Sequence, residues 1–358
     1  MAGEPDPAWL AYSQGMGKKR QKPGGGRGEL ELVDDIRRRA AKNVRGPGLR
    51  LGIGDDCALL RLRAGEELAV TTDLSIAGRH FRLDWHPPEA VGWRTLARGL
   101  SDLAAMGARP VAAFLSLGVP KELVVGGDDR PGSNKPWVET FLSGFFDLAK
   151  VYRVPLAGGD LAESPIALAD IVLAGAVPRG KALLRSGARA GDLLYVTGRL
   201  GGAAAGLEKL AKLSNREVGG PLPDEEWHEG LSMQLRPMPR IRQGLMLRQR
   251  GLATAAIDLS DGLSTDLAHL CDESGVQAVI EADALPIAPG ASVEQALNGG
   301  EDYELLFTAR PKARIPRAIA GVAVTRIGRI SRSGRPRVDL VSGVRNERLE
   351  PRGWEHFQ

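Results

Sequence analysis

The chain has 358 residues, of which 43% are hydrophobic and 26% charged, proportions typical of a globular protein that buries a large core. It has no apolar run of the ~20 residues that a membrane-spanning helix needs, and the N-terminus lacks the apolar core of a secretory signal. The two cysteines, Cys57 and Cys271, are far apart and in no metal-ligand spacing, so we expect a cytoplasmic protein without a disulfide framework or a membrane partner.

The net charge of +4 is unevenly distributed along the chain. Residues 1–28 carry +3 and residues 310–358 carry +8, which leaves −7 for the stretch between them. An acidic body with basic ends is not typical of a nucleic-acid-binding protein, so no nucleic-acid partner is expected. Such a body suits a protein that gathers cations and anionic phosphates.

The first elements in chain order are an extension, a helix and a glycine-rich bend. Residues 1–28 are rich in Pro, Gly and basic side chains and are predicted to be disordered; a basic arm that touches RNA or another protein is the alternative. Helical spacing of apolar residues predicts a helix over 29–43. The stretch LGIGDDCALL follows at 51–60, where Asp55 and Asp56 suit a hard cation such as Mg²⁺, or simply a solvated turn.

Oxygen-bearing side chains end the next predicted strand, and a carboxylate lies inside the next helix. The strand Glu67–Asp73 ends in Thr71, Thr72 and Asp73. A long helix is predicted over 87–106, because Pro87 and Pro88 suit a helix start. Asp102 lies there among small and apolar residues, where a carboxylate needs an arginine or a metal as its partner. Further strands are predicted over 111–119, 154–157 and 166–177, with a loop over 121–136 and a helix over 137–152.

The second half is predicted to begin after a polar connector at 179–190. Strand 192–197 leads through glycines into a helix, a loop is expected over 214–230, and a helix over 241–251. In AIDLSDGLSTDL a strand ends at Asp258, and a turn at Ser260 and Asp261 precedes a helix that opens near Ser264. Asp261 and Ser264 suit helix capping; a phosphate or a metal near the helix start is the functional alternative. Glu301 follows two glycines before another strand.

Aspartates beside glycine or hydroxyl residues recur along the chain, and we expect them to share one multi-metal phosphate site. Their number, without a histidine cluster, favours Mg²⁺ over zinc. Several Mg²⁺ ions imply a highly anionic ligand such as ATP, and bringing a second phosphate to ATP requires cations that screen the repulsion. The P-loop, protein-kinase, GxSxG and GxGxxG motifs are absent. The aspartates in question are Asp56, Asp73, Asp102, Asp160 and Asp258.

Eight ordered motifs resemble the thiamine-monophosphate kinase family from about Gly28 to Phe357: GIGDDCALL, TTDLSIAGRHF, LSDLAAMGARP, LAGGDL, LLRSGARAGD, AIDLSDGLSTDL, NGGEDYELLF and GWEHF. Its wider superfamily includes aminoimidazole ribonucleotide synthetase and selenophosphate synthetase. The resemblance implies a two-domain α/β (α+β) synthetase-like fold. The N-terminal domain, 29–180, would bind ATP and metal and pair into the barrel of a homodimer, and 181–358 would form a C-terminal α/β domain.

The resemblance also implies the reaction and its residues. The reaction is Mg²⁺- and ATP-dependent phosphorylation of thiamine monophosphate to thiamine diphosphate by direct in-line transfer. The implied ligands of several Mg²⁺ ions are Asp56, Thr71, Thr72, Asp73, Asp102, Asp160, Asp258 and Asp261. Implied ATP contacts come from Gly159, Asp160, Arg185 and Ser260. The implied substrate contacts are His80, Glu301 and Trp354, and no general base is identified.

Three departures and two alternatives accompany this resemblance. Leu161 stands where the family usually has threonine, the loop 126–136 is longer than usual, and Trp93 adds bulk to the helix before LSDLAAMG. A selenophosphate synthetase would carry a reactive Cys or selenocysteine in a glycine-rich N-terminal loop, and residues 24–27 contain none. A nucleotide-sensing protein that retained the fold without catalysis is the other alternative.

Overall fold

The computed structural model describes residues 29–44, 46–126, 135–214, 229–332 and 336–354. The extension predicted over 1–28, most of the loop 126–136 and most of the loop 214–230 lie outside the described residues. No helix in the described part is long and apolar enough to cross a membrane.

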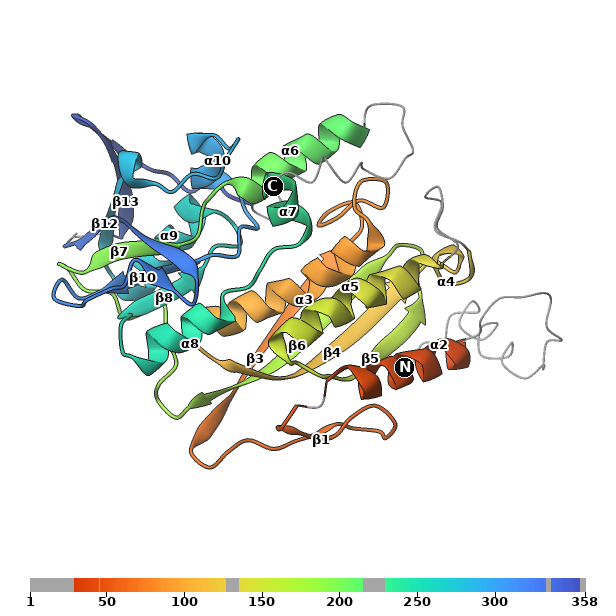
Figure 1. Cartoon of the computed structure of the whole chain (residues 1–358). Helices are drawn as coiled ribbons and strands as arrows, with labels where there is room; N and C mark the ends of the chain where they lie inside the picture. The colour runs from red at the N-terminus through yellow and green to blue at the C-terminus, as the bar shows by residue number, and fades with distance from the viewer. Residues whose placement is uncertain (1–28, 45, 127–134, 215–228, 333–335, 355–358) are drawn as a thin grey trace, which may run out of the picture.

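The N-terminal half is organised around a four-stranded sheet with the order β3-β6-β4-β5 (Figure 1). Neighbouring strands are antiparallel except β4 and β5, which are parallel and are joined through helices, as parallel strands require. A helix and a short hairpin precede the sheet. The bounds are α2 Glu29–Asn43, β1 Leu49–Leu51, β2 Leu59–Leu60, β3 Glu66–Ile76, β4 Arg109–Val119, β5 Leu156–Glu163 and β6 Leu168–Pro178.

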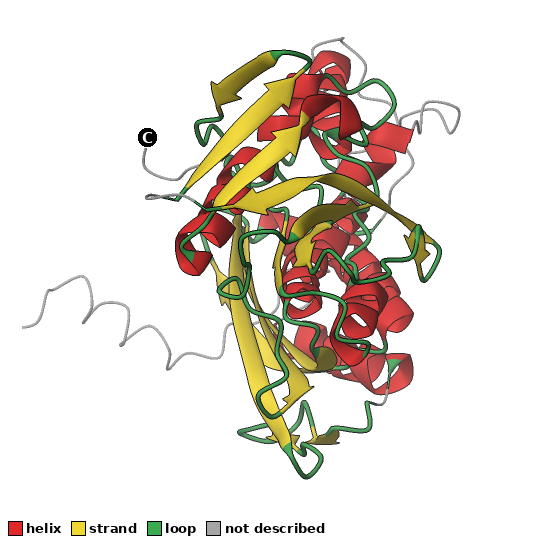
Figure 2. Ribbon diagram, turned by 90° about the vertical axis from the view of Figure 1, so that its left-hand side faces the viewer, coloured by secondary structure: helices red, strands yellow, loops and turns green. Residues whose placement is uncertain are grey.

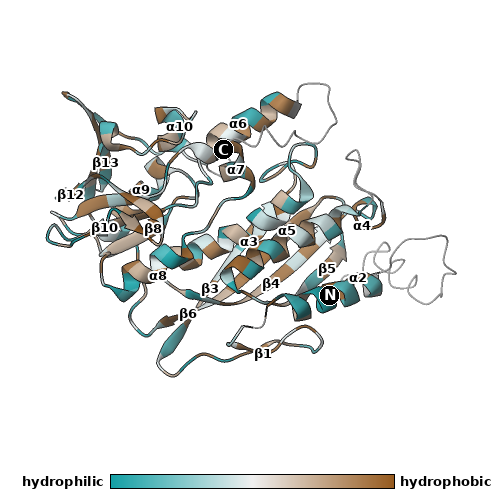
Figure 3. Cartoon of the chain, viewed as in Figure 1, coloured by the Kyte–Doolittle hydropathy of each residue, from teal (hydrophilic) through white to brown (hydrophobic). Residues whose placement is uncertain are grey.

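Helices α3 (Pro88–Ala105) and α5 (Trp137–Tyr152) cover one face of this sheet and pack against each other. In Figure 2 the strands form one side of the lower half of the molecule and the helices the other. The apolar faces of α3 and α5 contribute Leu96, Leu100, Phe141 and Phe145, which are fully buried in the main core. In Figure 3, by contrast, α2 is largely hydrophilic. A short helix, α4, spans Glu122–Val125.

The C-terminal half forms a second, larger sheet with the order β14-β13-β9-β12-β7-β10-β8. The strands are β7 Leu193–Thr197, β8 Ala255–Asp258, β9 Gln277–Glu281, β10 Leu305–Ala309, β11 Ala318–Ile319, β12 Val322–Ser331, β13 Arg337–Ser342 and β14 Arg345–Arg348. The helices are α6 Gly202–Ser214, α7 Glu229–Leu235, α8 Ile241–Gln249, α9 Leu263–Ser274, the 3₁₀ turn η3 Ala282–Ala284 and α10 Val293–Asn298.

Helix α3 connects the two halves and thereby positions the site. It contacts β3 and β6 of the first sheet and also α8 and β8 of the second half. The main core likewise continues from the first sheet to Leu305 and Phe307 on β10. Residues spaced by four along α3 therefore point from one rigid element into the space between the two sheets.

Most elements predicted in chain order are confirmed, with differences at the strand ends. Helix α5 has the predicted bounds. Strand β3 continues three residues beyond Asp73 to Ile76, and β5 continues through Asp160 to Glu163, because both pair along their full length with neighbouring strands. Such pairing partners are distant in the sequence, so glycine and aspartate were mistaken there for strand ends.

Candidate active site

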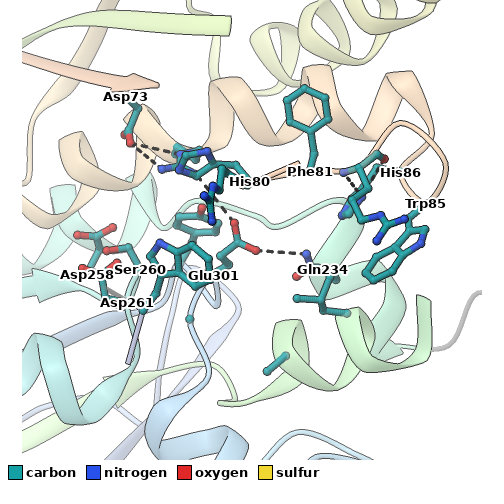
Figure 4. A pocket seen from close by; sticks show the side chains of 18 of the residues that line it. Asp73, His80, Phe81, Trp85, His86, Gln234, Asp258, Ser260, Asp261 and Glu301 are labelled. Carbon is teal, nitrogen blue, oxygen red and sulfur yellow. Dashed lines mark hydrogen bonds and ion pairs between the residues drawn. The ribbon is translucent and has the colours of Figure 1, made fainter. Parts of the chain in front are cut away.

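A cavity of about 480 Å³ lies between the two halves of the molecule. Its walls come from β3, the segment 77–86, α3, α7 and the loops that follow β8 and precede β10. Figure 4 shows that Asp73, Asp258 and Asp261 lie at one side, here called the acidic end, whereas Trp85 and His86 lie at the opposite side, here called the ring end.

Asp102 also belongs to the acidic end, and three of its carboxylates come from three different elements. Asp73 lies on β3, Asp102 on the last turn of α3 and Asp258 at the last residue of β8. Thr71 shares a face of β3 with Asp73, because side chains on a strand alternate, and its hydroxyl donates to Asp102 Oδ2. Ser101 Oγ donates to Asp258 Oδ2 at 2.7 Å. The structure thus brings together predicted residues from segments far apart in the chain.

Burial and mutual repulsion perturb these carboxylates. Burial raises the pKa of Asp102, and the negative charges of Asp258 and Asp73 raise it further. Burial also raises the pKa of Asp258 to about 6; the Ser101 hydrogen bond opposes this shift and the charge of Asp73 adds to it. Carboxylates that disfavour one another's charge are stabilised when a cation comes close.

Two arginines on one face of α3 connect the acidic end to Glu301. Arg98 Nη2 lies 3.1 Å from Asp73 Oδ1, and Arg98 Nη1 lies 3.9 Å from Glu301 Oε1. One turn earlier, Arg94 Nη2 lies 2.7 Å from the same Glu301 oxygen. Burial opposes ionisation of Glu301, but the charges of Arg94 and Arg98 outweigh it and lower the Glu301 pKa. Glu301 is therefore held as a carboxylate in the middle of the cavity.

Arg94 also fixes the segments around Glu301. Its guanidinium donates to the carbonyl oxygen of Gln234 at 2.8 Å and to that of His80 at 3.2 Å. The side chain is almost fully buried, so its charge is satisfied entirely by these partners and Glu301. Neither arginine was predicted from the sequence, although they lie eight and four residues before Asp102 and therefore on the same side of the predicted helix.

The turn that carries Ser260 and Asp261 is held by Asp266, a residue that was not predicted from the sequence to belong to the site. Asp266 Oδ2 accepts hydrogen bonds from the backbone N–H groups of Ser260, Asp261 and Gly262 at 3.0–3.1 Å. The N-cap residue of α9 is Gly262, which has no side chain to cap the helix, and Ser264 lies inside the helix and donates its Oγ–H to Asn298 Oδ1 at 2.7 Å. Ser260 and Asp261 line the cavity.

The loop that presents Glu301 is strained and firmly anchored. Glu301 and Tyr303 have φ values of 67° and 50°, a region that residues with side chains rarely adopt. Between them, Asp302 accepts from the backbone N–H groups at the start of α6, at 2.6 and 3.1 Å. Glu304 pairs with Arg240 and accepts from Thr197 Oγ1 at 2.6 Å. Strain at such a position persists only where the surroundings over-determine it.

A second cavity, of about 560 Å³, contains the remaining acidic motifs. Asp55, Asp56, Gly159 and Asp160 line it, on the side of the sheet where β5 forms the edge. Gly159 has φ +149°, and a Cβ atom there would lie 1.8 Å from the carbonyl oxygen of Leu115, so only glycine fits. Within one chain the expected single cluster is therefore divided between two cavities, because the hairpin that follows α2 packs near β5 and not near β8.

The other predicted residues have varied positions. His80 and Trp354 line the first cavity. Arg185 is exposed, but its charge is close enough to oppose the rise in the pKa of Asp102 and of Asp258. Thr72 is exposed on β3 and, by alternation, its side chain lies on the face opposite Asp73. Leu161 lines the second cavity.

The donor set fits Mg²⁺ bound partly through phosphate. Among the described residues, no group of three or more His, Cys, Asp or Glu side chains could hold a metal ion on its own. Mg²⁺ is usually bound by one or two carboxylates together with water and substrate phosphates. Burial and mutual repulsion disfavour the ionised forms of Asp102 and Asp258. Carboxylates of this kind match Mg²⁺ binding that is shared with substrate phosphates.

Comparison with known proteins gives consistent results over most of the chain. Two family models match the chain. The N-terminal domain of AIR synthase related protein matches residues 54–178, and the C-terminal domain of AIR synthase related protein matches residues 189–341. Thiamine-monophosphate kinase of Salmonella typhimurium is 39% identical over 321 residues, which cover 86% of this chain and 91% of that protein.

Two solved structures are similar in both sequence and fold. Thiamine-monophosphate kinase from Stenotrophomonas maltophilia K279a has a TM-score of 0.73 and 37% identity, covering 89% of this chain and 98% of that one. AaThiL complexed with AMPPCP and TMP has a TM-score of 0.68 and 31% identity, covering 92% and 97%. The mixed α/β fold with two AIR-synthase-type parts, predicted from the sequence, is confirmed.

Proposed function

Since the chain belongs to the thiamine-monophosphate kinases of the AIR synthase related family, we propose that it transfers the terminal phosphoryl group of ATP to thiamine monophosphate, forming thiamine diphosphate and ADP. The single observation that carries the proposal is the cavity whose acidic end, with Asp73 and Asp258, continues past Glu301 to a ring end with Trp85 and His86. A phosphate and a heteroaromatic ring in one substrate match those two ends.

We propose that Asp73, Asp102, Asp258 and Asp261 hold Mg²⁺ through which the phosphates bind at the acidic end. Bound Mg²⁺ neutralises negative charge on the phosphates during transfer. Thr71 and Ser101 orient the carboxylates through the hydrogen bonds that they donate to Asp102 and Asp258. In-line transfer is then a matter of positioning, to which the chain contributes a fixed set of oxygen atoms.

Arg98 lies beside the expected transfer site. It pairs with Asp73 and reaches toward Glu301, so it lies between the acidic end and the ring end. We propose that it orients Asp73 and adds positive charge where charge develops on the transferred group. A protein-derived general base is not required, because a phosphate monoester with a second pKa near ~6 already has an ionised oxygen at neutral pH.

We propose that the chain forms a homodimer through the exposed outer side of β3, the edge strand of the first sheet. Thr71 and Asp73 on β3 point toward α3, so the alternate residues Leu68, Val70 and Leu74 point the opposite way, and they are 53%, 58% and 45% exposed. Such an apolar row on an edge strand favours pairing with a second copy. Pairing would bring the β5 cavity, with Asp56, Gly159 and Asp160, to the interface, consistent with the predicted ATP contacts of those residues.

The cytoplasmic location is a further proposal. Cys57 is exposed, Cys271 is buried, and both are free thiols, which suits a reducing compartment. Fractionation of cells that produce the tagged protein tests this: recovery in a secreted or membrane fraction would contradict it.

One assay tests the proposed function directly. Purified protein is incubated with ATP, Mg²⁺ and thiamine monophosphate, and thiamine diphosphate and ADP are measured by chromatography. We expect equal amounts of the two products, none without thiamine monophosphate, and none after chelation of Mg²⁺. ATP binding without any product would favour the nucleotide-sensing alternative and would refute the proposed activity.

A further inference from the structure

Two buried polar atoms at the ring end have no hydrogen-bond partner. They are His86 Nε2 and Gln234 Oε1. The two side chains come from different segments, are 3% and 2% exposed, and line the cavity. An unsatisfied buried polar atom destabilises the folded state, so atoms of this kind on side chains that line a binding cavity point to a ligand that satisfies them.

The hydrogen bonds of His86 identify its free nitrogen as a donor. The backbone N–H of Arg82 donates to His86 Nδ1 at 3.1 Å, and because a peptide N–H can only donate, Nδ1 carries a lone pair. The Arg82 carbonyl oxygen, 3.3 Å from Nδ1, already accepts from the backbone N–H of His86 at 2.9 Å. Burial lowers the pKa of His86 to about 4. The ring is therefore neutral at pH 7, and its one proton is on Nε2.

The hydrogen bonds of Gln234 identify its free atom as an acceptor. Gln234 Nε2 donates to Glu301 Oε2 at 3.2 Å, which fixes the orientation of the amide and leaves Oε1 as the unpartnered atom. Arg94 holds both Gln234 and Glu301, because it donates to the backbone carbonyl oxygen of Gln234 and pairs with Glu301 Oε1. The ring end thus offers one acceptor, Gln234 Oε1, and one donor, His86 Nε2–H, both on preorganised side chains.

An acceptor and a donor on side chains that line one cavity are complementary to an amidine-like edge, in which an amino group lies beside a ring nitrogen. Thiamine monophosphate carries such an edge on its 4-aminopyrimidine ring, at the end of the molecule away from its phosphate. In Figure 4 Gln234 and His86 lie on the side of Glu301 away from Asp258 and Asp261. A substrate whose phosphate lies at the acidic end would therefore direct its pyrimidine toward this pair.

We propose that Gln234 Oε1 accepts a hydrogen bond from the pyrimidine amino group and that His86 Nε2–H donates to a pyrimidine ring nitrogen, so that this pair selects the aminopyrimidine and sets the direction of the substrate. The inference rests on the proposed function, because it takes thiamine monophosphate as the substrate. Neither residue was singled out by the sequence, in which one of five histidines and an isolated glutamine carry no pattern.

The test compares thiamine monophosphate with oxythiamine monophosphate, in which a carbonyl oxygen replaces the amino group. Wild-type enzyme should prefer thiamine monophosphate by about tenfold or more in kcat/KM, since a site built to accept a hydrogen bond rejects an analogue that cannot donate it. If wild-type enzyme uses both compounds equally well, the inference is overturned without any variant. If it phosphorylates neither, the proposed function itself fails.

Variants then assign the preference to the pair. Gln234→Met removes the acceptor, and we expect the ratio of the two kcat/KM values to fall about tenfold. His86→Asn retains an acceptor for the Arg82 N–H but removes the Nε2 donor, and should raise the KM for both compounds. Gln243→Met is the matched control, because Gln243 is also buried, donates to the Ile319 carbonyl at 3.1 Å and does not line the cavity; its ratio should equal the wild-type ratio.

Binding measurements keep the result interpretable if a variant is unstable. Isothermal titration of thiamine monophosphate into each variant that melts within a few degrees of wild type should show weaker binding for Gln234→Met and His86→Asn, and unchanged binding for Gln243→Met. An unchanged ratio in Gln234→Met together with unchanged affinity in His86→Asn would overturn the inference, whatever the level of activity.

Discussion

Replacing Asp258 by Asn should stabilise the metal-free protein while it abolishes kinase activity. Asp258 is 3% exposed, and burial with the charge of Asp73 raises its pKa to about 6 from the ordinary 3.8. A carboxyl group whose pKa is higher in the folded state binds more protons when folded. Its contribution to the free energy of unfolding therefore falls as pH rises from 3.8 to about 6 and remains lost above that range.

The size of the effect follows from that shift. A rise of roughly two units in the pKa of Asp258 corresponds to about 3 kcal/mol in the free energy of unfolding above pH 6. Asparagine keeps an oxygen that can accept the Ser101 hydrogen bond, but its amide group also has to be accommodated, so we expect a gain of about 1–3 kcal/mol at pH 7.5. In a chain of this length that corresponds to a melting temperature higher by about 1–4 °C.

Thermal unfolding in EDTA at pH 7.5 and at pH 5.0 measures the effect. The variant should melt above wild type at pH 7.5, and the difference should shrink at pH 5.0, where the wild-type carboxyl group is protonated. Added Mg²⁺ with a non-hydrolysable ATP analogue should raise the melting temperature of wild type more than that of the variant. Kinase activity should be lost.

Two outcomes would refute this reasoning. One is a melting temperature below that of wild type at pH 7.5 in EDTA, and the other is wild-type kinase activity in the variant. Asp339→Asn is the matched control, because Asp339 is also buried but pairs with Arg337 at 3.3 Å on β13, away from the cavity. It should lower the melting temperature and leave the kinase activity intact.

Three further predictions concern the metal, the nucleotide and the dimer. Chelation of divalent ions should reduce turnover to background and Mg²⁺ should restore it, whereas activity that persists in excess EDTA would contradict the role of the aspartates. Gly159→Ala should lower the free energy of unfolding by at least about 2 kcal/mol and weaken ATP binding by calorimetry. Gly180→Ala, also at positive φ but with nothing within 4 Å of the added Cβ, should lower the free energy of unfolding by less. Equal losses in the two variants would contradict the predicted clash of the Cβ at position 159 with the Leu115 carbonyl oxygen. Val70→Asp on the exposed outer side of β3 should convert the dimer to monomer by sedimentation, while Val344→Asp, at an exposed site on the turn between β13 and β14, should not; a wild-type monomer would contradict the proposed interface.

The sequence found the acidic residues because their local surroundings are distinctive. Each aspartate has a glycine or a hydroxyl residue within two positions, a pattern that neighbours along the chain define. The bounds of α5 were likewise predictable, since helical periodicity is a local property. By contrast, β5 extends past Asp160 because its pairing with β4 continues to Glu163, and no local feature encodes that pairing.

The residues that the sequence missed act through partners far along the chain. Two of the partners of Arg94, Gln234 and Glu301, are 140 and 207 positions away. Asp266 lies close in sequence to the turn that it holds, but its role depends on a turn conformation that residue types alone did not specify. The unpartnered atoms of His86 and Gln234 become meaningful only once burial is known.

The sequence by itself determined which side chains could gather phosphate and cations, and roughly which elements carry them, because these properties depend on residues near one another in the chain. Only the tertiary structure decided which of them meet. Ser101 and Asp258, 157 positions apart, are hydrogen-bonded, whereas Asp56 and Asp160 line a different cavity. The physical reason is that helix α3 packs between two sheets, and the distance between remote side chains is set by that packing and not by the chain that links them.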